Sequence, residues 1–238
     1  MRMRIFSTGF KGLLALCAWA GIVLQCGPFT SAPNFSTLRY YTLISNLLIA
    51  GYFSFAAIWA GKGRPAPLPT FKGALIMGIT VTGLVFHIML SGLDFGMGDD
   101  SGLGIGGTAQ AVANQLLHTV TPIMAVLDWL IFDKKGGYGK LAPLQWVIIP
   151  DVYFVLATIY GFTIGTPFYG GSRFPYFFID YDIQGVGGVL LYALALNLAF
   201  IALGYVFVLI DRLLAKIRKR SEKVPYFSLR EERYQKNP

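Results

Sequence analysis

The fold is decided by residues 185–210, which read GVGGVLLYALALNLAFIALGYVFVLI and contain no charged side chain. A helix of this length, rising about 1.5 Å per residue, is longer than the roughly 30 Å hydrocarbon core of a bilayer. Five other apolar stretches precede it, and the six expected spans are residues 12–28, 37–60, 73–93, 111–132, 141–165 and 185–210. The sequence therefore predicts an all-α protein, a polytopic bundle of six transmembrane helices.

The composition agrees with a membrane protein. Of the 238 residues, 55% are hydrophobic and 13% are charged, which is about half the charge content of an average soluble domain. The net charge of +8 would by itself suggest an anionic partner such as nucleic acid. The positions of the charges argue against that partner, because they sort by side of the membrane.

Lys and Arg cluster before the first span and at its start, and in the second and fourth connections and the C-terminal segment. These positions hold 18 of the 20 basic residues, and only Arg39 and Arg173 fall on the other side. The positive-inside rule then places both termini in the cytoplasm and makes the number of spans even. Asp94, Asp99 and Asp100 would face outward. We expect a multi-pass protein of the bacterial inner membrane.

The chain is expected to form one six-helix domain, residues 1–215, followed by a basic cytoplasmic tail, residues 216–238, that lies near anionic lipid head groups. The first span has an alternative reading as an export signal, because Ala18-Trp19-Ala20 resembles a cleavage site. Its apolar run continues to Leu24, which favours an uncleaved anchor.

Polar side chains in one layer of the expected bundle form the candidate site. Counted from the outer end of each span, Thr42 lies about 8 Å deep, His87 about 9 Å, His118 about 10 Å and Asn46 about 14 Å. Thr42 and Asn46 are four residues apart and share a helix face, and so do Asn114 and His118. A hydroxyl becomes a usable nucleophile when a base such as His is within hydrogen-bond reach, so Thr42 and His118 are the candidate catalytic pair.

The same residues have a structural reading, because a Thr often bonds its own helix backbone and a buried His can join two helices. Two histidines without a carboxylate at the same depth are too few for a closed zinc site, so we expect neither a metal nor another cofactor. Asn46, His87 and Asn114 complete the polar layer as supporting or substrate-contacting residues.

Other polar groups lie outside this layer. Asp151, near the bilayer middle, should be neutral or paired, and Asn197 lies at similar depth on the last span. Asp151 should face the bundle, with Val155 inward too. Asp128 and Trp129 are expected at the inner interface, where Asp can reach water and Trp anchors at head-group level. The aromatic segment 173–180 is expected either to form a lid or to belong to an aromatic belt.

The segments Arg39-Tyr-Tyr-Thr-Leu-Ile-Ser-Asn-Leu-Leu48 and Asn114-Gln-Leu-Leu-His-Thr119, followed by Asp128-Trp129, resemble the bacterial branch of the androgen-induced, FAR-17a-like six-helix membrane proteins. Animal members of that family are membrane threonine hydrolases that cleave fatty acid esters of hydroxy fatty acids with one Thr and one His. The resemblance implies that Thr42 is the nucleophile and His118 the base. His87 has no counterpart in the animal pattern.

Two functions from different classes remain open. The first is a hydrolase of lipid esters, with membrane lipids as its surroundings and a fatty acyl ester as its substrate. The second is a non-enzymatic membrane protein, a transporter or a small-molecule or lipid binder, that uses the same polar layer. The enzyme needs Thr42 and His118 to face each other across the second and fourth spans, whereas a transporter would show broken helices and a polar path reaching Asp151.

The 18-to-2 division of basic residues predicts that both ends of the chain are cytoplasmic. Reporter fusions measure this directly. An alkaline phosphatase fused at the C-terminus or after Gly61 should be inactive, and periplasmic activity of either fusion would contradict the predicted orientation.

Overall fold

The computed structural model of the protein describes residues 1–30, 33–91, 106–168 and 171–223. Asp94, Asp99, Asp100 and most of the expected tail lie outside the described residues. Six helices are long and apolar enough to cross a membrane, which confirms the all-α class and the six expected spans. They are Arg2–Cys26, Tyr41–Gly61, Pro69–Leu90, Gly107–Phe132, Ala142–Thr163 and Tyr181–Arg220. The chain is thus a polytopic helical membrane protein.

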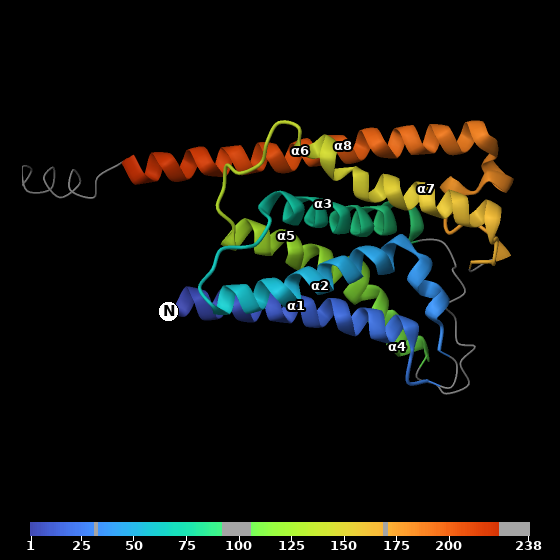
Figure 1. The fold of residues 1–238 in the computed structure, drawn as a ribbon, viewed down its shortest axis with the longest axis horizontal. Helices are drawn as coiled ribbons and strands as arrows, with labels where there is room; N and C mark the ends of the chain where they lie inside the picture. The colour runs from blue at the N-terminus through green and yellow to red at the C-terminus, as the bar shows by residue number, and fades with distance from the viewer. Residues whose placement is uncertain (31–32, 92–105, 169–170, 224–238) are drawn as a thin grey trace, which may run out of the picture.

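The helices run roughly along one long axis, and both ends of the described chain lie at the same end of the bundle (Figure 1). We call this the N-terminal end and the opposite one the far end. The elements in chain order are α1 (Arg2–Cys26), η1 (Phe35–Arg39), α2 (Tyr41–Gly61), α3 (Pro69–Val85), η2 (Phe86–Leu90), α4 (Gly106–Gln115), η3 (Leu116–Val120), α5 (Thr121–Phe132), α6 (Ala142–Trp146), α7 (Ile148–Thr163), η5 (Phe177–Ile179) and α8 (Tyr181–Lys223).

Local sequence sets the ends of several helices. Gly27 ends α1 in the left-handed conformation, at φ 53°, and its N–H bonds the Val23 carbonyl. Pro69 begins α3, where its missing N–H would have no partner in any case. Gly185, at φ 62° and ψ 173°, interrupts α8 after its first turn. From there α8 continues to Lys223, so the first residues of the expected tail, from Lys216, extend the last span.

Two spans contain a π-helical turn that the sequence pattern did not predict. η2 continues α3 and contains His87, while η3 joins α4 to α5 and contains His118. A π turn inserts an extra residue into a helix and is frequently found at functional sites. Both turns lie toward the far end of the bundle.

The outer surface and the helix contacts fit a lipid environment. Leu190, Leu191 and Leu194 of α8 are 57%, 69% and 59% exposed. Glycines lie where helices approach closely: a Cβ at Gly73 would lie 2.6 Å from the Trp146 ring, and one at Gly204 would lie 2.8 Å from Pro143. Small residues at such positions allow close backbone approach, on which helix packing in membranes depends.

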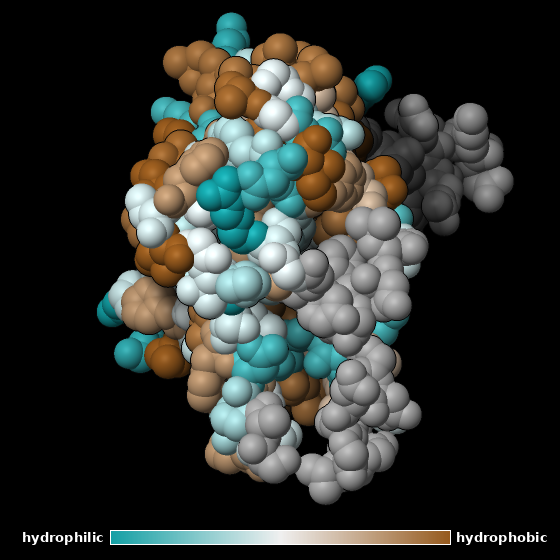
Figure 2. Space-filling model, turned by 90° about the vertical axis from the view of Figure 1, so that its right-hand side faces the viewer, coloured by the Kyte–Doolittle hydropathy of each residue, from teal (hydrophilic) through white to brown (hydrophobic). Residues whose placement is uncertain are grey.

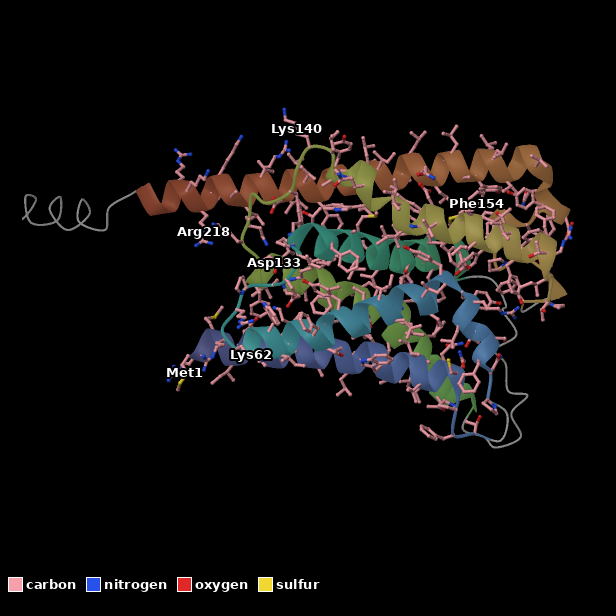
Figure 3. All side chains as sticks on the ribbon, in the orientation of Figure 1. Met1, Lys62, Asp133, Lys140, Phe154 and Arg218 are labelled. Carbon is pink, nitrogen blue, oxygen red and sulfur yellow. The ribbon has the colours of Figure 1, made fainter. Side chains whose placement is uncertain are left out.

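A buried cluster of charges joins three helices at the N-terminal end. Lys11 of α1 bonds Asp128 of α5 at 2.7 Å, and Lys72 of α3 bonds both Asp128 and Asp133 at 2.5 Å. Lys11 is 3% exposed, and Lys72 and Asp128 are fully buried. Asp133, labelled near the start of α3 in Figure 3, follows the end of α5. Burial raises the pKa of the Asp133 carboxyl, and Lys72 opposes that rise.

The expectation that Asp128 reaches water and Trp129 anchors at the membrane surface is wrong. Both side chains are in the interior, with exposures of 0% and 1%. The reason is that Lys11 and Lys72 turn into the bundle and supply the partners that Asp128 would otherwise find in water. Trp129 packs against Phe207 of α8 and is overlaid by Lys135.

We expect Asp128→Ala to lower the free energy of unfolding by about 3–5 kcal/mol, because it leaves two buried ammonium groups without their shared carboxylate. Denaturant unfolding of the purified protein in detergent gives the value. The matched control is Asp182→Ala, which removes an exposed ion pair with Arg173 and should leave stability almost unchanged. Equal effects of the two substitutions would contradict the assigned role of the cluster.

Candidate functional site

Thr42 and His118 meet in the interior of the bundle. The Thr42 Oγ1 lies 3.1 Å from the His118 Nε2, and the two residues are 9% and 8% exposed. Thr42 is the second residue of α2, and His118 lies in the middle of the π turn η3. The structure thus brings together two residues that the sequence placed at one depth on different spans.

The second imidazole nitrogen fixes the orientation of His118. Its Nδ1 lies 3.1 Å from the backbone carbonyl oxygen of Asn114, which can only accept a hydrogen bond. The proton of a neutral imidazole is therefore on Nδ1, and Nε2 is the acceptor that faces the Thr42 hydroxyl. Phe86 stacks on the imidazole with ring centroids 3.9 Å apart and holds the ring plane.

Asn46 joins α2 to the π turn. Its Nδ2 donates to the carbonyl of Thr42 at 2.8 Å and to the carbonyl of Leu117 at 3.2 Å. With both N–H groups used, Asn46 supports the site and has no donor left for a substrate. Asn114 contributes its backbone carbonyl to His118, while its buried Oδ1 has no hydrogen-bond partner among the described residues.

His87 does not join the pair. Its Nε2 lies 3.0 Å from Thr119 Oγ1, and the residue is exposed on the surface of the bundle. Each π turn thus carries one histidine, and each histidine bonds a threonine, but only the His118 contact is buried. Within the described part of the chain, no three His, Cys, Asp or Glu side chains come together as metal ligands.

Tyr176 completes the site, although the sequence reasoning did not assign it a role. Its side chain lines the same pocket as Thr42, and its hydroxyl lies near the Thr42 side chain and the first backbone N–H groups of α2. Burial raises the pKa of Tyr176 to about 12, and these contacts oppose the rise. The phenol is therefore neutral near pH 7 and keeps its proton to donate. The only sequence signal was the aromatic segment 173–180 itself.

That segment closes the far end of a pocket. Phe178 and Ile179 are buried, and Asp180 holds the turn by accepting bonds from Ser172 and from the backbone of Asp182. In Figure 2, which looks onto this end, hydrophilic residues gather in the middle of the face and hydrophobic ones lie along much of its rim.

The pocket lies among α2, α3, α7, α8 and the segment 173–180 and is partly open, and the space in it that can hold the centre of a water molecule is about 80 Å³. Thr42 and Tyr176 are in its wall, and His118 lies behind Thr42, outside the lining. Most of the lining is apolar, including Val81, Leu196 and Phe154, which lies between α7 and α8 in Figure 3. This is the composition of a site for an apolar ligand with few polar anchors.

Asp151 and Asn197 form another polar part of the pocket wall, which also contains the hydroxyl-bearing residues Thr82, Tyr41 and Tyr153. Asn197 Nδ2 donates to Asp151 Oδ1 at 2.8 Å, so Asp151 is paired across α7 and α8 as its cost in the membrane requires. The expectation that Val155 also faces inward is wrong, because it is 51% exposed. Asp151 lies at the edge of the helix face that points into the bundle. Val155 follows four residues later, which is about 40° more than one full helical turn, and this extra rotation carries its side chain toward the lipid side.

Comparison of the chain with protein-family models, with curated proteins and with solved structures finds no match. The family resemblance of the Thr42 and His118 segments therefore stays a hypothesis.

We expect Asn46→Leu to lower the free energy of unfolding by about 1–2 kcal/mol, because two carbonyl groups lose their shared donor in an apolar interior. The leucine has a similar volume, so a cavity does not contribute. Thr163→Val is the control, since the Thr163 hydroxyl bonds only the backbone of its own helix at an exposed position. Thermal unfolding in detergent compares the two variants, and an unchanged midpoint for Asn46→Leu would contradict its role as a link.

Proposed function

We propose that the protein is an integral membrane hydrolase of fatty acyl esters, acting in the bacterial inner membrane with Thr42 as nucleophile and His118 as base. The observation that supports this most is the buried contact of 3.1 Å between Thr42 Oγ1 and the acceptor nitrogen of His118, beside an apolar pocket. A hydroxyl next to a base that is itself oriented by a third group is the usual arrangement of an activated nucleophile.

In the first half of the reaction, Thr42 Oγ1 attacks the ester carbonyl carbon and His118 Nε2 takes the hydroxyl proton. The C–O bond of the ester breaks, and His118 returns the proton to the leaving oxygen, which departs as an alcohol. In the second half, His118 takes a proton from water, and the resulting hydroxide attacks the acyl-Thr42 carbonyl. The acid is released and Thr42 recovers its proton.

The developing oxyanion has candidate donors beside Thr42. The backbone N–H groups of Tyr41 and Thr42 belong to the first turn of α2, where no carbonyl of the helix can pair with them. The neutral phenol of Tyr176 lies against the same groups. Helix N-termini and preorganised donors stabilise negative charge that forms in the transition state.

A binder without chemistry remains the second candidate function. The observation in its favour is that the pocket extends from Thr42 to the Asp151–Asn197 pair, so one ligand can contact both polar groups. Covalent reaction at Thr42 distinguishes the two functions.

An alkyl fluorophosphonate should label the wild-type protein at Thr42, and Thr42→Ala should abolish the label. His118→Ala should remove it too without unfolding the protein, because the hydroxyl loses its base and keeps its scaffold. Thr42→Ser should retain part of the fluorophosphonate labelling. The matched control is His87→Ala, which alters the exposed histidine and should leave labelling intact. Label that survives in Thr42→Ala would defeat the hydrolase proposal.

A further inference from the structure

The Asp151–Asn197 pair has no part in the chemistry proposed at Thr42, although both are in the wall of the same pocket. An acidic side chain in a membrane span marks a functional site by default, because its insertion is costly and a leucine would pack as well. Asp151 lies in the first turn of α7, just after the break between α6 and α7, where the helix dipole favours a carboxylate.

The hydrogen bonding of the pair leaves acceptors free. Asn197 gives one N–H to Asp151 Oδ1, and among the described residues neither Asp151 Oδ2 nor Asn197 Oδ1 has a partner. Both free atoms are oxygens, which are hydrogen-bond acceptors, so a ligand that binds this part of the pocket needs a hydrogen-bond donor. Leu196, Phe200 and Phe154 line the same pocket with apolar side chains.

We propose that Asp151 and Asn197 form a second polar subsite that binds the hydroxyl of an uncharged, hydroxyl-bearing lipid whose apolar chain fills the pocket. The O–H donates to the free carboxylate oxygen, a hydrogen bond that is strengthened by the apolar surroundings. A hydroxyl fits better than an ammonium group, because burying a neutral donor in this lining costs less than burying a charge. The inference relies on the proposed function only in placing the ligand's acyl group at Thr42.

The test measures binding without chemistry. Purified full-length protein in detergent, as wild type and as Thr42→Ala, is titrated with 1-dodecanol and with 1-methoxydodecane, which lacks the O–H. Dissociation constants come from the rise in the thermal unfolding midpoint with ligand mole fraction in the micelle. The alcohol should bind about tenfold more tightly than the ether to both proteins, as expected for one well-made hydrogen bond.

Asp151→Leu should reduce this preference to less than about twofold, because it removes the acceptor, while Asp182→Leu, which changes an exposed carboxylate outside the pocket, should keep it. If Asp151→Leu does not fold, Asp151→Asn decides the question, because it replaces the carboxylate by a neutral amide and should weaken the preference. Equal binding of alcohol and ether to the wild type, or a full preference that persists when Asp151 is substituted, would overturn the subsite. Tighter binding of dodecylammonium than of dodecanol would overturn its assignment to a neutral hydroxyl.

The outcome is separable from that of the proposed function. An alcohol preference without fluorophosphonate labelling of Thr42 would defeat the hydrolase and support the subsite. Labelling without an alcohol preference would defeat the subsite alone.

Discussion

A bilayer core holds no water, so the backbone groups of each span must bond within the protein, and a polar side chain there is stabilised by a partner on another helix. At the N-terminal end, Lys11, Lys72 and Asp128 satisfy one another across α1, α3 and α5. Toward the far end, the Thr42 hydroxyl and the His118 imidazole do the same across α2 and η3. The first contact joins helices through charges, and the second holds a neutral hydroxyl against a base.

These two polar layers differ in what lies next to them. The charge cluster is covered by the rings of Phe132 and Phe53, which lie over Lys11 and Lys72, and both carboxylate oxygens of Asp128 are engaged. The Thr42–His118 pair lies beside a pocket, with Tyr176 and the first N–H groups of α2 around the hydroxyl. A satisfied, enclosed network stabilises the fold, whereas a polar group that faces an open apolar pocket is available to a ligand.

The sequence was sufficient for the six spans and for placing Thr42 and His118 at one depth, because both depend on the rise along a helix, whereas the 3.1 Å contact between them comes from the structure. The sequence did not predict the features that depend on a local distortion of a helix or on tertiary contacts. The π turns η2 and η3 leave no mark in the apolar pattern. Lys11 and Lys72 directly precede the expected first and third spans, but both are buried inside the bundle. Tyr176 belongs to an irregular segment, whose placement depends on tertiary contacts such as those of Asp180.

A cryo-EM structure of the protein after reaction with an alkyl fluorophosphonate would show whether Thr42 is a nucleophile served by His118. We expect phosphorus bonded to Thr42 Oγ1, the alkyl chain in the pocket beside Leu196, and His118 Nε2 within hydrogen-bond distance of the adduct. An adduct on another residue, or Thr42 and His118 side chains more than roughly 8 Å apart, would contradict it.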